Sequence, residues 1–327
     1  MSVPRISVII INWNELEHVS DLLGSLRNQI YQDFEIIFVD NNSKDGSLEY
    51  VETHFQEAQV LKLDYNAGFA AANNRGIERA KGEYIALINS DTVVDSGWLV
   101  NALNCLENHP EAGFCASKLI NYYDRNKIDA AGDLYTRGGV NEKRGLGENI
   151  AKYNGEEYVF GACAAAVLYR KSMLEEIGCF DEDFFIMCED VDLNFRAQLA
   201  GYKCIYCPDS VVYHKVHGSI GKIKKIFSYY GQRNIEYVYI KNMPFWICIL
   251  HLPLHLLYNT LVACYFFLKG ELKNFLMAKS HFFQEIPSLM RKRQSIQKVR
   301  KVSYKYLFSV MSTGWLRRKI KRRYRSI

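Results

Sequence analysis

The sequence predicts an α/β fold in which a mostly parallel sheet is covered by helices on both faces. Two observations support this prediction. Short apolar runs alternate with segments of helical spacing over the first 115 residues, and polar side chains follow the ends of several apolar runs. Continuous apolar runs are typical of strands that are buried on both faces. The repeated β-α-β order makes successive strands parallel and places helices between them.

The elements of this first part follow one another regularly. The predicted strands are short and rich in apolar residues, and they lie at 6–11, 34–39, 60–63, 84–88 and 113–120. The predicted helices show apolar residues three and four positions apart, and they lie at 16–29, 47–55, 68–80 and 98–107. In a sheet of this kind, ligands bind at the carboxyl ends of the strands.

The second part of the chain is less regular. Residues 121–157 are polar and rich in Gly, Asn and Lys, which predicts an insertion with short strands or a mobile loop. A helix is expected at 189–200 and a strand at 202–213, and the pattern is helical from residue 222 onward. We therefore divide the chain into an α/β domain, residues 1–220, and a helical C-terminal region, residues 221–327.

Charge is distributed unequally along the chain. Residues 1–214 contain 18 Lys and Arg against 33 Asp and Glu, whereas residues 215–327 contain 23 against 3. The basic region predicts an anionic partner, either a membrane surface or a nucleic acid. We favour the membrane and expect no nucleic acid, because the acidic first part would repel a phosphate backbone. The nine cysteines are an odd set and fit a reducing compartment better than a disulfide framework.

One apolar segment of the C-terminal region is long enough to cross a bilayer. Residues 245–268 contain no Asp, Glu, Lys or Arg, but His251, His255 and Asn259 are four apart and form a polar stripe on one helical face. Such a stripe favours an interfacial or re-entrant helix, with a membrane span and a buried helix as alternatives. Basic residues mixed with Trp, Leu, Ile and Tyr at 315–325 fit an anionic inner leaflet or a solvated tail.

Two acids follow predicted strands and are candidates for ligand binding. Asp40 is either part of a turn or a carboxylate that accepts a hydrogen bond from a pyrimidine N–H. Asp91 is either a helix cap or a ligand for Mg²⁺ or Mn²⁺ that also contacts phosphates. His214, after the strand predicted at 202–213, is a candidate second ligand for that ion.

A further acidic cluster lies in residues 180–190, where five acids stand among aromatic and apolar neighbours. Acids in apolar surroundings have raised pKa values and can act as general bases. The alternative is that they cap the helix predicted at 189–200. No glycine-rich dinucleotide fingerprint or P-loop follows the first strand, which disfavours dehydrogenases and P-loop enzymes.

Taken in order, these segments resemble the family 2 inverting glycosyltransferases with the GT-A fold, and within them the bacterial and archaeal rhamnosyltransferase-like subgroup. The resemblance covers residues 5–240. The matching pieces are Ser7–Asn14, Val39–Ser47, Asn66–Ala70, Asn73–Asn74 with Gly76, Leu87–Asp91, Gly161–Ala162, Gly178–Glu182, Glu189–Leu193 with Arg196, His214 with Gly218 and Ser219, and Arg233–Asn234.

The resemblance implies a set of donor-binding residues. Asp40 would contact a uracil or thymine base, and the other members would surround the nucleotide and line the donor pocket. The full set implied is Asn12, Asn14, Asp40, Asn66, Gly68, Asn73 and Asp91.

The resemblance also implies the metal ligands and the catalytic base. Asp91 would be the metal-binding end of the family's Asp-x-Asp motif, in which Asn89 here replaces the first Asp. His214 would complete the site for Mg²⁺ or Mn²⁺. Asp190 would be the catalytic base and Glu189 would orient the acceptor.

The function implied is transfer of a sugar from TDP-rhamnose or a UDP-sugar to a glycan hydroxyl, by single displacement with inversion. Asp192 is a second candidate for the base. The apolar and basic C-terminal region favours a lipid-linked acceptor at the cytoplasmic face of the membrane, with the enzyme peripheral or re-entrant. The alternative function is a catalytically inactive sugar-nucleotide-binding or scaffold protein.

Overall fold

The fold is built on one large mixed sheet. A computed structural model describes residues 3–216 and 224–314 of the chain. Within them, the strands of the sheet lie side by side in the order β10 (Glu157–Val159), β12 (Lys203–His214), β6 (Ala112–Asn121), β11 (Ala166–Arg170), β4 (Tyr84–Asn89), β1 (Ile6–Asn12), β2 (Phe34–Asp40) and β3 (Ala58–Lys62). β5 (Thr92–Val94) pairs with β12, and β7 (Ile128–Ala131) pairs with β6.

One half of the sheet is parallel, as the sequence predicts. β4, β1, β2 and β3 run in the same direction, with Ile9 of β1 opposite Ile37 of β2 and Leu87 of β4. These three side chains are at most 1% exposed, which explains the unbroken apolar runs. β11 runs antiparallel to both β4 and β6, so the other half of the sheet is mixed.

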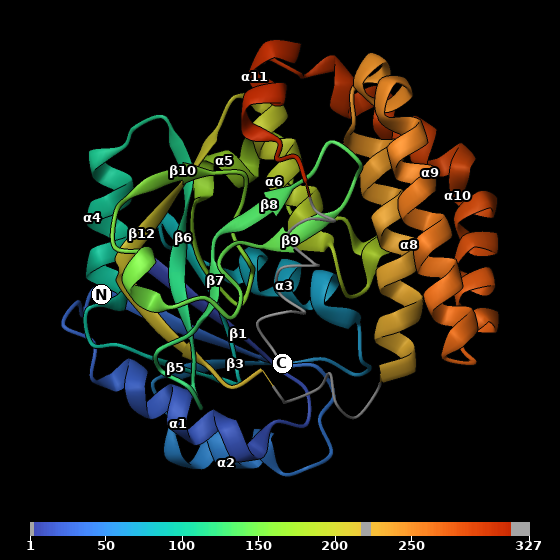
Figure 1. Cartoon of the computed structure of the whole chain (residues 1–327). Coiled ribbons are helices and arrows are strands. Elements are labelled where there is room, and N and C mark those ends of the chain that lie inside the picture. Colours follow the sequence, from blue (N-terminus) through green and yellow to red (C-terminus); the bar gives the residue numbers. More distant parts are fainter. Residues whose placement is uncertain (1–2, 217–223, 315–327) are drawn as a thin grey trace.

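Helices cover both faces of the sheet (Figure 1), which confirms the predicted α/β class. The period-two alternation of each strand sends neighbouring side chains to opposite cores, so Val8 packs with one cluster and Ile9 with the other. The first face carries α1 (Leu16–Arg27), α2 (Ser47–His54) and α4 (Trp98–Asn108). The second carries α3 (Gly68–Arg79), α5 (Lys171–Ile177) and α6 (Glu189–Ala200).

The polar segment 121–157 forms short strands, which is one of the two structures predicted for it. β7 extends the sheet beside β6, and a hairpin of β8 (Asp133–Tyr135) and β9 (Asn141–Lys143) forms a small second sheet. A short 3₁₀ turn, η1 (Ile150–Lys152), precedes β10. Every residue of β7 is buried, so this segment is part of the domain and not a surface loop.

The C-terminal region forms a layer of long helices beside the sheet domain (Figure 1). α8 (Lys224–Asn242), α9 (Phe245–Leu268) and α10 (Leu272–Lys298) are followed by the short α11 (Tyr304–Val310). One apolar cluster joins Phe184 and Phe195 of the first part to Tyr237 and Phe282 of the helices. The domain boundary at residue 220 remains a prediction, and the described residues on its two sides share a core.

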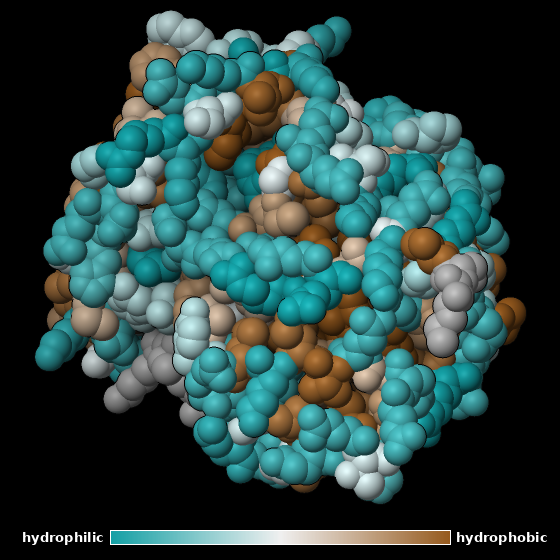
Figure 2. Space-filling model, turned by 180° about the vertical axis from the view of Figure 1, so that it is seen from behind, coloured by the Kyte–Doolittle hydropathy of each residue, from teal (hydrophilic) through white to brown (hydrophobic). Residues whose placement is uncertain are grey.

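The surface has apolar and hydrophilic parts. The face opposite to that of Figure 1 is mainly hydrophilic, with apolar side chains gathered near the middle of the view (Figure 2). The predicted basic segment 315–325, together with Gly218 and Ser219 of the family-like motifs, lies outside the described residues.

Candidate functional site

The predicted donor-binding residues begin at the carboxyl ends of β1 and β2. Asn12 and Asp40 are opposite each other in the parallel register, and both side chains are fully buried. Asn12 donates from Nδ2 to Ser43 Oγ (2.9 Å) and Ser47 Oγ (2.7 Å), and weakly to Asp40 Oδ1 at 3.4 Å. Asp40 also accepts the Ser43 backbone N–H at 3.2 Å. The Asp40 carboxylate therefore closes a turn, as one alternative predicted, and Asn12 Oδ1 is left buried without a partner among the described residues.

Asn14 and Asn66 hold the loops around this pair. Asn14 has a left-handed backbone (φ 57°), and its Oδ1 accepts the Lys44 backbone N–H at 2.7 Å. Asn66 Oδ1 accepts from Asn41 Nδ2 at 3.0 Å, while Asn41 Oδ1 accepts the Ala67 N–H at 2.8 Å. These amides shape the chain from β2 to α3.

Gly68 is required by its surroundings. Its φ of +82° is unfavourable for a residue with a Cβ, and a Cβ there would lie 2.5 Å from Phe185 Cδ2. The Phe185 carbonyl accepts the N–H groups of Phe69 (2.6 Å) and Ala70 (3.2 Å) at the start of α3. Asn73, one turn further, is buried and donates to the Phe69 carbonyl at 2.8 Å. The donor side of the site is thus joined to the segment that leads to Asp190.

Asp91 and His214 lie together, as the sequence predicts. His214, at the end of β12, is 6% exposed, and its Nε2 lies 3.2 Å from Asp91 Oδ1. The cap alternative for Asp91 is taken by Asp95, whose Oδ1 accepts the Gly97 N–H at 2.9 Å before α4. Two ligand atoms that each lie about 2.1 Å from one octahedral ion are about 3 Å apart. A carboxylate oxygen and an imidazole nitrogen at this spacing suit Mg²⁺ or Mn²⁺.

The buried Asp129 and the partly buried Lys143, both from segment 121–157, complete this group. Asp129 Oδ2 lies 2.8 Å from His214 Nδ1 and accepts from Lys143 Nζ at 2.7 Å. Burial alone would raise the pKa of Asp129, but the hydrogen bond from His214 and the charge of Lys143 outweigh it and lower the pKa to about 2. Burial alone would lower the pKa of His214, but its hydrogen bonds to Asp129 and Asp91 outweigh it and raise the pKa to about 9.

Asp190 and Glu189 begin α6, as predicted. Asp190 accepts the Ala164 N–H at 3.2 Å and the Val191 N–H at 2.8 Å, which fixes its carboxylate. Burial raises the pKa of Asp190 and of Glu189, and the charge of Asp190 raises that of Glu189 further. Glu189 Oε2 is buried without a hydrogen-bond partner among the described residues. An unpaired buried carboxyl oxygen is a costly feature that a ligand would relieve.

The loop at residues 164–165 places Asp190 near the end of β4. Ala164 donates to Asp190, and the next carbonyl, that of Ala165, accepts the Asn89 N–H at 3.1 Å. Asn89 is two residues before Asp91, so the candidate base and the candidate metal ligand are on the same edge of the sheet.

Asp133 of β8 is a buried acid that interacts with Asp190. It is 7% exposed, and burial raises its pKa to about 8, with the charge of Asp190 contributing in the same direction. Asp133 is therefore protonated at neutral pH in the folded chain.

The hairpin that carries Asp133 and Lys143 is held by the C-terminal helices. The carbonyl of Gly138, at its tip, lies 2.9 Å from Nδ1 of the buried His255 in α9. The other ring nitrogen of His255 lies 2.8 Å from Glu236 Oε2, and the ring stacks on Tyr239 with centroids 3.9 Å apart. The two ring nitrogens of His255 thus join the hairpin tip to Glu236 of α8. Gly139 is required here, because a Cβ would lie 2.5 Å from Tyr239.

The segment ahead of Asp190 has an unfavourable backbone. Phe185, Met187 and Cys188 all have positive φ angles, between 61° and 73°. Such angles cost roughly 1–2 kcal/mol for each residue with a side chain. The buried Asn234 of α8 stabilises the segment, since its Nδ2 donates to the carbonyls of residues 184, 186 and 187 at 2.7–2.9 Å.

Asp192, the second candidate for the base, is bound in a buried network. Its carboxylate accepts from Arg196 Nε (2.9 Å), Asn242 Nδ2 (2.6 Å) and Lys241 Nζ (2.7 Å). Asp192 is fully buried and Lys241 is 1% exposed. With its oxygens occupied, Asp192 is suited to hold α6 on α8, and Asp190 is the better candidate for the base.

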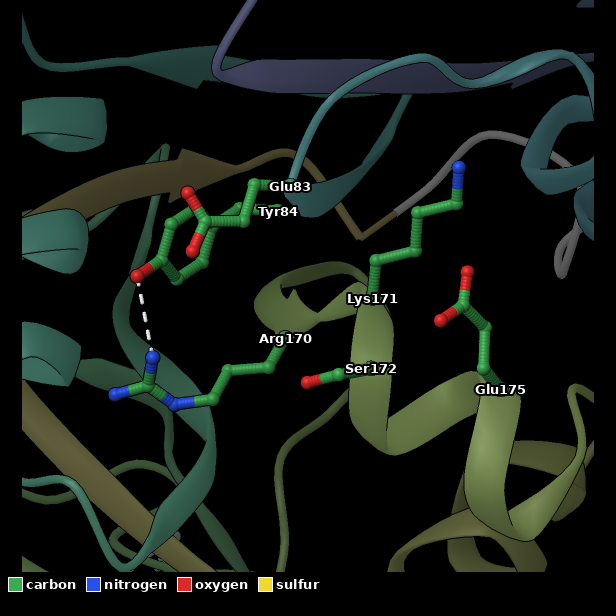
Figure 3. Close-up of a pocket in the computed structure, with 6 residues that line it drawn as sticks. All are labelled: Glu83, Tyr84, Arg170, Lys171, Ser172 and Glu175. Carbon is green, nitrogen blue, oxygen red and sulfur yellow. Dashed lines mark hydrogen bonds between the residues drawn. The ribbon is translucent and has the colours of Figure 1, made fainter.

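A cavity of about 220 Å³ lies at the opposite end of the sheet. Figure 3 shows Arg170 hydrogen-bonded to the hydroxyl of Tyr84 at its wall, with Lys171 and Glu175 on α5. Tyr84 is the first residue of β4, whereas Asn89 at the far end leads to Asp91. This cavity is therefore separate from the candidate site.

Comparison with known proteins identifies the family. The model for glycosyl transferase family 2 matches residues 7–178, which is more than half of the chain. The chain belongs to glycosyl transferase family 2. The rhamnosyltransferase-like subgroup is not confirmed by the comparisons.

Relatives of this family-2 chain include polysaccharide synthases. It is 28% identical over 231 residues to poly-beta-1,6-N-acetyl-D-glucosamine synthase of Staphylococcus epidermidis, which covers 68% of this chain and 53% of that one. It is 26% identical over 242 residues to glycosyltransferase AglE of Haloferax volcanii, covering 69% and 72%. The chain thus spans about half the length of the synthases that it matches.

Solved structures confirm a GT-A-like fold. S. aureus TarS 1–349 in complex with UDP has a TM-score of 0.58 and 20% identity, covering 90% of this chain and 86% of that one. The mannosyltransferase PcManGT from Pyrobaculum calidifontis, in complex with GDP-Man and Mn²⁺, has a TM-score of 0.54 and 17% identity, covering 95% and 79%.

Sequence reasoning missed four residues of the candidate site. Asn41 was named only as part of a motif, and Asp129, Asp133 and Lys143 lie in the segment that was predicted as an insertion or loop. The one signal was the presence of acids in a segment that was otherwise rich in Gly and Asn.

Proposed function

We propose that this family 2 glycosyltransferase moves a sugar from a UDP-sugar to a hydroxyl of a lipid-linked glycan, with inversion and with the help of a divalent cation. The observation that carries the proposal is the partly buried Asp190, whose pKa is raised by desolvation, on the same sheet edge as the Asp91–His214 pair. A base, a metal site and an edge where ligands bind are the parts that this reaction needs.

Asp190 is the proposed base. The backbone N–H groups of Ala164 and Val191 fix its carboxylate, so it takes the proton from an acceptor hydroxyl in one orientation. Its raised pKa makes it a stronger base than an ordinary aspartate. Glu189, whose pKa burial also raises, has a buried carboxyl oxygen without a hydrogen-bond partner among the described residues, and we assign it the role of orienting the acceptor.

Asp91 and His214 would hold Mg²⁺ or Mn²⁺ on the diphosphate, and Asn12, Asn14, Asp40, Asn66, Gly68 and Asn73 would surround the nucleotide and donor sugar. When bound, the cation would neutralise charge on the departing nucleoside diphosphate. The unpartnered Asn12 Oδ1 beside Asp40 supports a hydrogen-bonding ligand at this end. Phe185 packs on Gly68, so the segment that leads to Asp190 lies against the proposed donor-binding residues.

The relatives favour UDP as the nucleotide. TarS has been solved with UDP and with UDP-GlcNAc, and the staphylococcal relatives are named as synthases of an N-acetylglucosamine polymer. The rhamnosyltransferase-like motifs of the sequence make TDP-rhamnose the second donor to test.

The exposed side of α9 supports the lipid-linked acceptor. His255 of the predicted polar stripe faces the protein interior, whereas Trp246, Leu250 and Leu257 are half or more exposed. α9 is the one helix among the described residues that is long and apolar enough to cross a membrane. An apolar side turned outward and a polar side turned inward suit a helix that lies on a bilayer. We propose a peripheral position at the cytoplasmic face, where the basic C-terminal region would meet anionic lipid.

The first experiment measures nucleotide binding and turnover on the full chain. UDP, TDP and GDP are each added with and without Mn²⁺, and the melting temperature is recorded. We expect a Mn²⁺-dependent rise with UDP that is lost in Asp91→Ala. The Asp190→Asn variant should retain the rise and lose about 10²–10⁴-fold in kcat for sugar transfer to an acceptor glycan. Nucleotide binding without turnover in the unmodified chain would favour the inactive scaffold protein.

The second experiment measures binding to vesicles. The full chain should sediment with vesicles that contain anionic phospholipid, and Leu250→Glu should weaken this at least tenfold. Ile30→Glu is the matched control, because Ile30 is 69% exposed and Leu250 is 66% exposed, but Ile30 lies in the sheet domain. Equal binding by the two variants would contradict the role of α9.

A further inference from the structure

His214 is contacted by carboxylates on both sides of its ring. Nε2 lies 3.2 Å from Asp91 Oδ1, and Nδ1 lies 2.8 Å from Asp129 Oδ2. Asp91 follows β4, whereas Asp129 is in the middle of β7, next to β6 and therefore one strand away from β12. Asp129 is 2% exposed, so it contacts His214 from within the protein and not from the ligand side.

Lys143 holds Asp129 in this position. Its Nζ lies 2.7 Å from the same oxygen, Oδ2, that accepts from His214. Lys143 ends β9, in the hairpin that α9 supports, and β9 lies next to β7, where Asp129 is. The order of contacts is therefore Lys143, Asp129, His214 and Asp91, a row whose two middle members are buried and which ends at the candidate metal site.

This row decides which nitrogen of His214 is free for a ligand. A neutral imidazole has one N–H and one lone pair, and the hydrogen bond of one nitrogen determines the state of the other. An ionised carboxylate only accepts, so Asp129 requires a proton on Nδ1. A cation that binds here displaces the Nε2 proton that the ring otherwise donates to Asp91, and the lone pair is then on Nε2. With the proton still on Nε2, the ring donates to Asp91 and offers no lone pair there.

We propose that Asp129, held by Lys143, is a positioning residue that orients His214 and presents its Nε2 to a divalent cation shared with Asp91. This inference rests on the proposed function, and it assigns a role to two residues of segment 121–157. Carboxylates behind metal-binding histidines commonly act in this way, and their loss typically costs 10–100-fold in metal affinity.

The test is a titration of the full chain with Mn²⁺ and UDP, in which electron paramagnetic resonance reports the free ion. Asp129→Ala should weaken Mn²⁺ binding about 10–100-fold. Asp129→Asn should lose less, because its amide oxygen can still accept from Nδ1, and Lys143→Met should fall between the two. Asp124→Asn is the matched control, since Asp124 is in the same segment but exposed and paired with Lys127 at 2.8 Å. It should bind Mn²⁺ as the unmodified chain does.

A kinetic readout separates positioning from a purely structural role. At saturating Mn²⁺, kcat of Asp129→Asn should return to within about twofold of the original value, because the base Asp190 is unchanged. A loss of kcat that Mn²⁺ does not restore would overturn the proposal, as would unchanged Mn²⁺ affinity in both Asp129→Asn and Lys143→Met. If Asp129→Ala does not fold, Asp129→Asn and Lys143→Met still test the proposal.

Asp91→Ala distinguishes failure of the proposed metal site from failure of the positioning role of Asp129. If Asp91→Ala binds Mn²⁺ as well as the unmodified chain does, the proposed metal site itself fails. If Asp91→Ala loses the ion but the Asp129 and Lys143 variants retain it, the metal site stands and the positioning role is refuted.

Discussion

The buried acid Asp133 makes the stability of the chain depend on pH in a defined direction. Its pKa is about 8 in the folded chain, against about 3.9 in an unfolded one. An acid with a higher pKa in the folded state binds its proton more tightly when folded. Its contribution to stability is therefore fully present below about pH 4, and it is lost as the pH rises through about 8.

The change that tests this is Asp133→Asn, which replaces the protonated acid by a neutral group of the same shape. Between about pH 5 and about pH 8, the unmodified chain should lose about 1.4 kcal/mol of unfolding free energy per pH unit relative to the variant. For a chain of this size, that is about 2–3 °C in melting temperature per pH unit. Because Asp133 is 7% exposed, screening by solvent does not reduce the effect greatly.

The assay is a series of melting curves on both proteins in buffers from about pH 5 to about pH 9. The difference in melting temperature should grow in favour of Asp133→Asn up to about pH 8 and then level off. Asp124→Asn is the control, since Asp124 is exposed and its hydrogen bond with Lys127 lowers its pKa, so its difference should stay flat over this range. A difference for Asp133→Asn that does not change with pH would refute the reasoning.

Three further substitutions have defined outcomes. Gly68→Ala should lower the free energy of unfolding by at least about 1–2 kcal/mol and weaken UDP binding, because the new Cβ would collide with Phe185. An affinity for UDP, measured by calorimetry, that equals that of the unmodified chain would contradict this. Lys241→Met should cost about 3–5 kcal/mol in urea unfolding, because it removes one of the two cations that pair with the buried Asp192 and also unpairs Asp181. A cost below about 1 kcal/mol would show that water enters the network. Asn234→Ala should lower kcat more than it weakens UDP binding, since it releases the segment ahead of the base; equal losses in both would place its effect on the whole fold.

The parallel half of the sheet was predictable because the burial of each strand is visible in its own residues. β1, β2 and β4 are enclosed on both faces, so the run of apolar residues marks them without knowledge of their neighbours. β7, β8 and β9 are only three or four residues long and depend on partners that are distant in the sequence. The polar composition of segment 121–157 predicted short strands or a loop without deciding between them, and the antiparallel direction of β11 left no local signal either.

The residues of the candidate site also fall into those that the sequence predicts and those that only folding brings together. Asp91 follows β4 and His214 ends β12, where a polar residue after an apolar run is conspicuous in the sequence. Asp129 is 85 residues from His214, and only the pairing of β7 with β6 brings them together. The like-charge interaction of Asp133 with Asp190 also arises from folding, since Asp133 is in β8 and Asp190 is in α6.

The contact between α9 and the β8–β9 hairpin bears on how the chain matures during synthesis. Gly138 is made 117 residues before His255, the group that holds its carbonyl. Domains fold as the chain emerges from the ribosome, beginning with the N-terminal part. The sheet and its donor-side loops can therefore form early, whereas the hairpin with Asp133 and Lys143 gains its last support only after α9 has emerged. A nascent chain that stops before α9 would have the edge proposed to bind nucleotide but not the support of the hairpin that carries Asp133 and Lys143, so the proposed transfer activity would begin only after α9 has emerged.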